Sequence, residues 1–257
     1  MHRRYIERSR VGQPSKVLSL KTDVSIIIPV YNDANCIAKC LKSVTGWEEV
    51  NAQIIVVEGQ SHDHTMDEIT PFVTEINHLI SEKDNGVYDA MNKGLDHIKS
   101  DWVYFLGADD TVLSESAMKS LIVMNGDEKI RIGKVKIITH DSRVPNEYPA
   151  AFGPCLVWRN CTHHQGALYH HSLFQTRKFD TSFKILADYK MNLELWLKGQ
   201  KALLSEVELA ECGDGGLSRD FSDALYSEEL RLKNELLSGW KSWIQPIWVA
   251  LKKRYKS

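Results

Sequence analysis

Two adjacent carboxylates, Asp109 and Asp110, come just after the apolar run 102–106. Negative charges side by side raise each other's pKa unless a cation neutralises them. Carboxylate oxygens are ligands that suit Mg²⁺ or Mn²⁺, and such an ion can also bind the phosphates of a nucleotide. The alternative is a carboxylate that caps a helix beginning near Ser114. Because the pair follows a predicted buried strand, we favour a metal site.

The segment 84–94, which reads DNGVYDAMNKG, combines a tight turn with a helix whose start is polar. Its first residues fit a turn in which Gly86 takes a positive φ. The first turn of the helix presents free backbone N–H groups, which suit phosphate or hydroxyl oxygens. Asp89, Asn92 and Lys93 lie within one turn of each other and could together engage a nucleotide. The alternative, an ordinary amphipathic helix with an N-cap, leaves that polar cluster unexplained.

Polar residues also follow two other predicted strands. Tyr31 and Asn32 come after the run 24–30, where a tyrosine ring could stack on a base, although Asn32 could equally cap a helix. Glu58 follows the run 53–57, and an acidic side chain in that place can accept hydrogen bonds from a base or ribose.

The elements that position these residues alternate along the first half of the chain. The apolar runs are 24–30, 53–57, 77–80 and 102–106, and the helical candidates are about 34–45, 63–76 and 86–99. Apolar strands that alternate with helices predict a parallel sheet with helices on both faces, which binds ligands at the carboxyl ends of its strands. After residue 110 the pattern predicts helices at 114–124, 187–199 and 222–238, and strands at 131–139 and 202–209.

Composition narrows the class of protein. The 257 residues are 43% hydrophobic and 26% charged, as in an ordinary soluble protein, and the formal charge of −2 argues against wholesale nucleic-acid binding. The five cysteines form no CxxC pair, which fits a reducing compartment. Cys36 and Cys40 would share a helix face, where packing explains them better than a disulfide or a metal. With no secretory signal and no run of eighteen apolar residues, we expect a cytoplasmic protein.

Four motifs in order resemble the inverting glycosyltransferases of family 2, which have the GT-A fold. These motifs are the strand at 25–32, the loop at 58–65, the turn and helix at 84–94, and the acidic segment 107–110. The sequence of the third motif, residues 84–94, is similar to that found in the branch of the family that includes colanic-acid-type and other surface-polysaccharide transferases. The resemblance implies an α/β fold with a Rossmann-like, mostly parallel central sheet, helices on both faces, and a helical, amphipathic C-terminal tail.

The resemblance also implies an activity and a division of the chain. The reaction would move a sugar from a nucleotide diphosphate sugar, most often a UDP-sugar, to a glycan or lipid-linked glycan during surface-polysaccharide biosynthesis. The cofactor would be Mn²⁺ or Mg²⁺. We expect a lead-in at 1–22, a transferase domain at 23–220 with a nucleotide-sugar half at 23–110 and an acceptor half at 111–220, and a C-terminal helix and tail at 221–257.

The family pattern assigns roles to individual residues. Asp110 would be the firmest metal ligand, and Asp109 would join it or touch the ribose or sugar. Binding of the nucleotide sugar would involve Pro29, Tyr31, Asn32, Glu58, Ser61, Asp84, Asn85, Gly86, Asp89, Asn92, Lys93, Ala108 and Asp109. Two departures from the pattern matter: Glu58 stands where an Asp is usual, and Gly107 replaces the first carboxylate of a D-x-D motif, which could lower metal affinity.

The second half should supply a general base, because inversion needs a group that deprotonates the attacking acceptor hydroxyl. Asp188, at the start of the predicted helix 187–199, is the candidate that the resemblance favours, and an N-cap is the alternative. His163, His164 and Gln165 resemble the family's HQ motif on the acceptor or diphosphate side, although a buried structural histidine is equally compatible.

Two further features of the second half are less specific. Ser218 and Arg219 are similar to a late GGxS loop that closes over the diphosphate, but glycines also make ordinary turns. His170 and His171 lack the helical spacing of a zinc site.

The C-terminal segment 240–257 mixes tryptophan with lysine and arginine and has no acidic residue. Such a segment suits the interface of an anionic membrane, where it would bring the protein to a lipid-linked acceptor. A last helix that packs on the domain is the competing interpretation, and Pro246 would break or bend it.

Two other functions remain open from the sequence. A nucleotidyltransferase would share the fold class, but such enzymes carry a Gly-rich basic loop after the first strand, where this chain has residues 30–34 (VYNDA). A non-catalytic nucleotide-sugar-binding module is the other alternative, since Gly107 and Glu58 depart from the family pattern.

Overall fold

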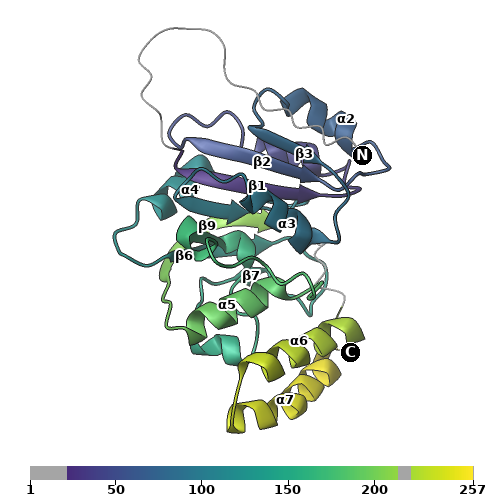
Figure 1. Cartoon of the computed structure of the whole chain (residues 1–257), viewed down its shortest axis with the longest axis vertical. Helices are drawn as coiled ribbons and strands as arrows, with labels where there is room; N and C mark the ends of the chain where they lie inside the picture. The colour runs from purple at the N-terminus through teal and green to yellow at the C-terminus, as the bar shows by residue number, and fades with distance from the viewer. Residues whose placement is uncertain (1–21, 214–220, 257) are drawn as a thin grey trace.

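The computed structural model describes residues 22–213 and 221–256. It is an α/β structure built on one twisted sheet, with the last two helices side by side at one end (Figure 1). The strands are β1 Val24–Val30, β2 Ala52–Glu58, β3 His78–Ser81, β4 Trp102–Phe105, β5 Thr111–Val112, β6 Ile130–Ile137, β7 Glu147–Tyr148, β8 Ala167–His170 and β9 Leu203–Cys212. The α-helices are α1 Ile37–Lys42, α2 Thr65–Ile69, α3 Val87–Leu95, α4 Glu115–Ile122, α5 Ala187–Leu197, α6 Asp223–Leu236 and α7 Trp240–Lys256. Short 3₁₀ helices are η1 Thr70–Phe72, η2 Pro154–Val157, η3 His164–Gly166 and η4 His171–Leu173.

The sheet runs in the order β3-β2-β1-β4-β8-β6-β9-β5, and β7 pairs with β6. The four strands β3, β2, β1 and β4 are parallel, so their carboxyl ends lie at one edge. β8 is antiparallel to both β4 and β6, whereas β9 is parallel to β6. The parallel order therefore ends at β4, and the acidic turn that follows β4 lies at this change of direction.

The sheet is covered on both faces because its strands are apolar on both sides. In β1, Ile27 packs with residues of α3 and α5 in one core cluster. Its neighbours Ile26 and Ile28 pack in a second cluster with residues of α1 and α4. Successive side chains of a strand point to opposite faces, so one run of isoleucines holds both layers together. The α/β fold class with helices on both faces is thus confirmed.

Several elements differ from the sequence-based expectations. The predicted helix 63–76 is shorter, because α2 gives way to the 3₁₀ turn η1, whose second residue is Pro71. The short strands β5, β7 and β8 were not predicted, since two to four residues carry too little periodicity. Helix α7 continues through Pro246, which is exposed to solvent, instead of ending there.

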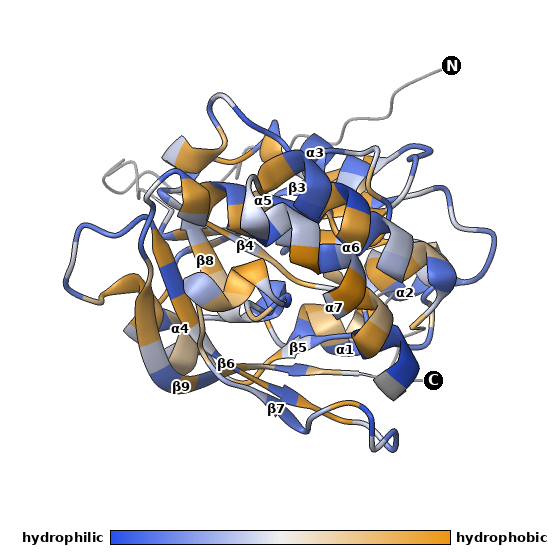
Figure 2. Ribbon diagram, turned by 90° about the horizontal axis from the view of Figure 1, so that it is seen from below, coloured by the Kyte–Doolittle hydropathy of each residue, from blue (hydrophilic) through white to orange (hydrophobic). Residues whose placement is uncertain are grey.

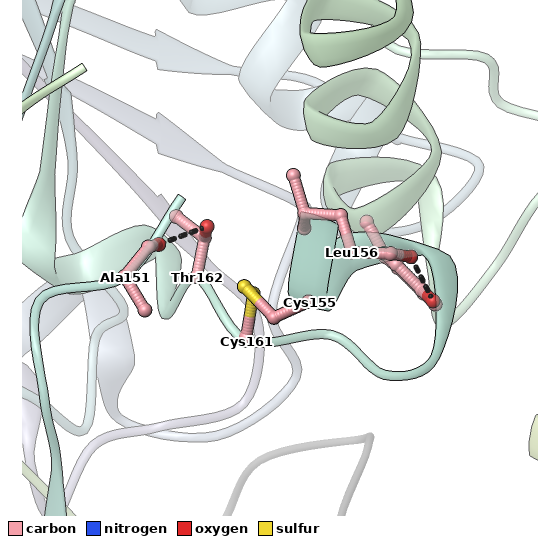
Figure 3. The surroundings of a disulfide bond; sticks show 6 residues. Ala151, Cys155, Leu156, Cys161 and Thr162 are labelled. Atoms are coloured by element: carbon pink, nitrogen blue, oxygen red, sulfur yellow. Dashed lines mark hydrogen bonds between the residues drawn. A yellow bond between two sulfur atoms is a disulfide. The ribbon is translucent and has the colours of Figure 1, made fainter. Parts of the chain in front are cut away.

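The pairing of Cys155 with Cys161 differs from the expectation that the cysteines form no disulfide. Cys155 and Cys161 form a disulfide whose Cα atoms are 6.1 Å apart (Figure 3), so the pattern typical of a reducing compartment does not hold for this pair. Among the described residues, Cys36, Cys40 and Cys212 take part in no disulfide, in agreement with a packing role for the first two. The disulfide closes the loop that leads to η3, and the next residue, Thr162, donates a hydrogen bond of 2.6 Å to the Ala151 carbonyl.

Helix α7 carries two different faces. Gln245 and Val249 are buried toward the rest of the protein, while Trp243 is 82% exposed. Figure 2 shows apolar turns of α7 leading into a hydrophilic C-terminal turn. Within the described residues, no helix is both long and apolar enough to cross a membrane.

Candidate active site

A cavity of about 780 Å³ opens beside the carboxyl ends of β1 and β4. Its walls come from the end of β1, the turn into α3, the acidic turn after β4, the segments 143–149 and 159–165, and the start of α5. Residues of α6 and α7 close the far end. The volume is in the range of small-molecule sites, and the cavity lies where ligands bind in open α/β sheets.

Tyr31 and Asp84, two of the predicted nucleotide-binding residues, line the cavity side by side. Tyr31 is 55% exposed, so one face of its ring is available for stacking. A side chain at Gly59 would come within 2.5 Å of an Asp84 oxygen and 3.2 Å of the Tyr31 ring. Glycine at this position therefore allows the carboxylate and the ring to lie together. Gly86 has a φ of 114°, which confirms the expected turn, and its N–H donates to Asp84 Oδ1 at 2.9 Å.

The side chains of Asp109 and Asp110, which follow β4, border the same small space beside Gly107. A Cβ at Gly107 would lie 2.5 Å from Asp110 Oδ2 and 3.0 Å from Asp109 Oδ1. Glycine at this position therefore creates space that both carboxylates border, and its departure from the D-x-D pattern has a steric reason.

Asp110 is 4% exposed, and burial together with the charge of Asp109 raises its pKa to about 6. Gln165 Nε2 donates to its Oδ2 at 2.5 Å, and the Gly213 N–H donates to Oδ1 at 3.2 Å. These hydrogen bonds fix the carboxylate in place. Two oxygen donors around a small space, with a buried charge that the protein does not fully neutralise, fit a hard divalent cation.

Asp188 lies across the cavity on α5. The N-cap of this helix is Leu186, so the alternative in which Asp188 caps the helix is wrong. The Tyr88 hydroxyl donates to Asp188 Oδ1 at 2.8 Å, and His164 Nδ1 lies 3.3 Å from Oδ2. Asp188 and Asp110 both line the same cavity. The residues predicted as base and as metal ligand thus share one site.

Some predicted nucleotide-binding residues have structural partners within the protein. Glu58 is buried, where it accepts hydrogen bonds from the Ser61 N–H and from Ser81 Oγ. Asn32 accepts from the His62 N–H at 2.8 Å and donates its own N–H to Ser61 Oγ at 2.9 Å. These contacts join the loops that follow β1 and β2. Glu58, Asn32 and Ser61 support the cavity wall and do not line it.

The polar cluster at the start of α3 is explained in the same way. Asp89 accepts from the Asn85 N–H at 2.9 Å, and Lys93 Nζ donates to the Lys83 carbonyl at 2.7 Å. Asn92 is buried and exchanges hydrogen bonds with the backbone of Phe179. These side chains fasten the turn and α3 to neighbouring segments, so the ordinary structural interpretation accounts for them.

The remaining predicted residues are placed as follows. Pro29 and Ala108 line the cavity, as do His163, His164 and Gln165 of the HQ motif. The His163 and His164 rings stack with centroids 5.7 Å apart. Ser218 and Arg219 lie outside the described residues.

Sequence reasoning missed several residues of the cavity. Tyr88 lies within the segment 84–94 but has no role in the sequence-based prediction, although its phenol contacts the predicted base. Asp33 also lines the cavity, and its own burial, together with the charge of Asp109, raises the pKa of Asp33. Glu229 and Lys252 come from the two C-terminal helices, and no local motif connects them to the site.

A separate group of metal-ligand atoms lies elsewhere. Among the described residues, Asp101, His170 and His171 bring one such atom each within 4.8 Å of one another. Asp101 precedes β4 and Asp109 follows it, so this group is at the opposite end of the strand from the cavity. It is distinct from the predicted Asp109–Asp110 site.

Comparisons with known proteins agree with this architecture. The family model described as Glycosyl transferase family 2 matches residues 25–146. A PGL/p-HBAD biosynthesis glycosyltransferase of Mycobacterium bovis (strain BCG / Pasteur 1173P2) is 28% identical over 224 residues, which cover 82% of this chain and 85% of that protein. Glycosyltransferase GlyA of Streptococcus pneumoniae is 24% identical, with 78% of this chain and 32% of that protein covered.

Two solved structures are similar in fold. S. aureus TarS 1-349 in complex with UDP-GlcNAc has a TM-score of 0.67 and 16% identity, over 90% of this chain and 72% of that one. The mannosyltransferase PcManGT from Pyrobaculum calidifontis, in complex with GDP-Man and Mn2+, has a TM-score of 0.63 and 16% identity, over 93% and 72%.

The fold and the site together define a GT-A glycosyltransferase. More particularly, the chain is similar to glycosyltransferase family 2, whose family model matches residues 25–146.

Proposed function

We propose that this chain transfers a sugar, with inversion, from a nucleotide diphosphate sugar to a hydroxyl of a glycan or lipid-linked glycan in surface-polysaccharide biosynthesis. The observation that carries the proposal is a single cavity that joins the carboxylate pair after β4 to the enclosed Asp188. A UDP-sugar is the first donor to test, because UDP-GlcNAc is the ligand of the similar TarS structure.

Asp110 and Asp109 would hold Mn²⁺ or Mg²⁺. The support is the space that Gly107 leaves between their oxygens and the raised pKa of the buried Asp110 carboxyl. A bound divalent ion would stabilise the negative charge of the departing nucleoside diphosphate.

The chain's own residues would supply binding and proton transfer. The exposed Tyr31 ring would stack on the base, while Asp84 beside it would accept hydrogen bonds from the nucleoside. The enclosed Asp188 would provide the negative charge that proton removal from the acceptor requires. Gln165 would keep Asp110 oriented through its 2.5 Å hydrogen bond.

The proposal is tested by screening nucleotide sugars for donor hydrolysis in the presence of Mn²⁺. We expect one donor to be hydrolysed with inversion, which NMR of the freshly released sugar would show. Asp188→Asn should keep nucleotide binding and lose about 100-fold or more in rate, the usual contribution of general base catalysis. A wild-type protein that hydrolyses none of the donors, or an Asp188→Asn variant with unchanged turnover, would contradict the proposal.

We also propose that helix α7 contacts an anionic membrane. Trp240, Trp243, Ile247 and Leu251 follow each other at helical spacing and are 64%, 82%, 65% and 57% exposed. Residues spaced by three or four lie on one helix face, and Lys253 and Arg254 adjoin this stripe. An exposed apolar stripe with flanking cations suits the interface of anionic lipid.

Sedimentation with vesicles tests this contact. We expect binding to phosphatidylglycerol vesicles but little binding to phosphatidylcholine, and a several-fold loss of binding in Ile247→Ser. Val123→Ser is the matched control, because Val123 is similarly exposed at 62% but lies at the end of α4. Equal binding by the two variants would refute a membrane-facing role for α7.

A further inference from the structure

Three side chains that can bind a metal meet at the end of the sheet away from the cavity. Asp101 comes directly before β4, His170 is the last residue of β8, and His171 begins η4. Each brings one ligand atom, and these atoms lie within 4.8 Å of one another. The sequence alone argued against zinc here, because the two histidines lack helical spacing. The third side chain comes from a distant segment, and only the fold brings it to them.

Backbone hydrogen bonds hold the three residues beside one another. β4 and β8 are antiparallel, with Trp102 opposite His170. The His171 N–H donates to the Asp101 carbonyl at 2.7 Å. The His170 N–H donates to the Lys129 carbonyl at 2.8 Å. The sheet itself therefore keeps these side chains together.

The separation of His171 and Asp101 suits two ligands of one ion. His171 Nδ1 lies 3.8 Å from Asp101 Oδ1, which is too long for a hydrogen bond. Two ligands that are each about 2.1 Å from a zinc ion can be at most about 4.2 Å apart. Nδ1 of His171 is enclosed and, within the described part of the chain, has no hydrogen-bond partner. An enclosed polar atom needs a partner, and a cation beside Asp101 would be one.

Ser172 orients the third ligand, His170. The Ser172 hydroxyl lies 2.9 Å from His170 Nδ1, where it can accept a hydrogen bond. A proton on Nδ1 leaves the lone pair on Nε2 for a metal, and a hydrogen bond from the other ring nitrogen is the usual way to orient a metal-binding histidine. The Ser172 N–H also approaches Nδ1, at 3.3 Å, and favours the opposite tautomer. A cation at Nε2 would select the tautomer that makes the shorter contact.

We propose that Asp101, His170 and His171 form a binding site for Zn²⁺, with water as the fourth ligand. Two imidazoles and a carboxylate are a ligand set that zinc adopts in proteins, whereas Mg²⁺ and Mn²⁺ suit sites made of oxygen alone. The ion would join the start of β4 to β8 and η4, at the place where the parallel order of the sheet ends. Its role is to stabilise the sheet, and it does not depend on the proposed transfer reaction.

Calorimetric titration with Zn²⁺ alone tests the site. The starting protein is the full chain with Asp110→Asn and without a polyhistidine tag, because Zn²⁺ can also bind the carboxylates beside the cavity. We expect it to bind one Zn²⁺ ion. His171→Ala and Asp101→Asn, each added to the starting protein, should weaken binding at least about ten-fold. His140→Ala is the matched control, because His140 is an exposed histidine outside the group, and should leave the affinity unchanged.

Melting curves give a second readout. Zn²⁺ at about 100-fold its Kd should raise the melting temperature of the starting protein by several degrees, and His171→Ala should lose most of this shift. Mn²⁺ should affect wild type and the single variant His171→Ala alike, because it prefers oxygen ligands. A starting protein that binds no Zn²⁺, or an affinity unchanged in both His171→Ala and Asp101→Asn, would overturn the proposal. Neither result bears on the donor screen, so failure of this site and failure of the proposed function are separate outcomes.

Discussion

Asp110 is a buried carboxylate whose charge the protein neutralises only in part. Gln165 and the Gly213 N–H each donate one hydrogen bond to it, yet burial and the neighbouring Asp109 still raise its pKa to about 6. The sequence alone pointed to Asp109 and Asp110, because two adjacent aspartates follow a predicted strand. It could not explain Gly107, because only the folded turn shows that a Cβ added at this position would lie 2.5 Å from Asp110 Oδ2.

The raised pKa of Asp110 predicts how metal binding depends on pH. A carboxyl with a raised pKa stabilises the fold while it is protonated, and this contribution is lost as the pH rises through about 6. Below about pH 6 a cation must displace the proton of Asp110. At higher pH the carboxylate is already ionised when the cation binds. We therefore expect Mn²⁺ to raise the melting temperature more at about pH 7.5 than at about pH 5.5.

A series of melting curves with and without Mn²⁺ checks this prediction. Asp110→Asn is the control, because it removes the titrating group and should lose most of the Mn²⁺ effect at both pH values. A Mn²⁺ effect that is larger at the lower pH would contradict the assignment of Asp110 as a metal ligand.

At the level of elements, the apolar runs predicted the parallel core well. β1 has the expected bounds, and β2, β3 and β4 differ from theirs by one residue at one or both ends. A continuous apolar run leaves little choice besides a strand buried on both faces. Sequence reasoning did not foresee contacts with partners distant in sequence, as at the polar start of α3, where Asn92 exchanges hydrogen bonds with the backbone of Phe179.

Close packing of α3 on β1 predicts that even a small side chain at Gly94 would destabilise the fold. A Cβ at Gly94 would lie 2.5 Å from a methyl group of Ile27, which is fully buried. We expect Gly94→Ala to lower the free energy of unfolding by about 1–3 kcal/mol, because overpacking forces the helix away from the strand.

Chemical denaturation measures this change. Lys42→Ala, at the exposed end of α1, is the control and should change stability by less than about 0.5 kcal/mol. An unchanged or increased stability of Gly94→Ala would show that the helix and strand are not in this contact.

At the level of the whole molecule, a buried charge cluster joins the C-terminal helices to the cavity. Glu229 is 3% exposed and accepts hydrogen bonds of 2.7 Å from both Lys233 and Lys252. Lys233 also donates to the Trp158 carbonyl at 3.0 Å, which ties α6 to the loop that carries the disulfide. Glu229 and Lys233 are four residues apart on α6, but the contacts with Lys252 and Trp158 do not follow from local sequence patterns, because those partners come from other segments.

Removal of Glu229 should therefore destabilise the C-terminal helix pair. Glu229→Ala leaves two lysines without their common partner, and breaking a buried ion pair costs about 3–5 kcal/mol. Glu235→Ala is the matched control on the same helix, because Glu235 pairs with Lys190 at a site where its side chain is 42% exposed. The control should cost less than about 1 kcal/mol. Equal losses in the two variants, measured by urea unfolding, would contradict the role of Glu229.

Calorimetric titration of UDP, GDP and dTDP, with and without Mn²⁺, tests the central claim most directly. We expect one nucleotide to bind wild type and Asp188→Asn alike, only when Mn²⁺ is present, and to bind Asp110→Asn at least about ten-fold more weakly. Nucleotide binding that needs no divalent ion, or that survives in Asp110→Asn, would contradict an enzyme in which these carboxylates hold the donor beside Asp188.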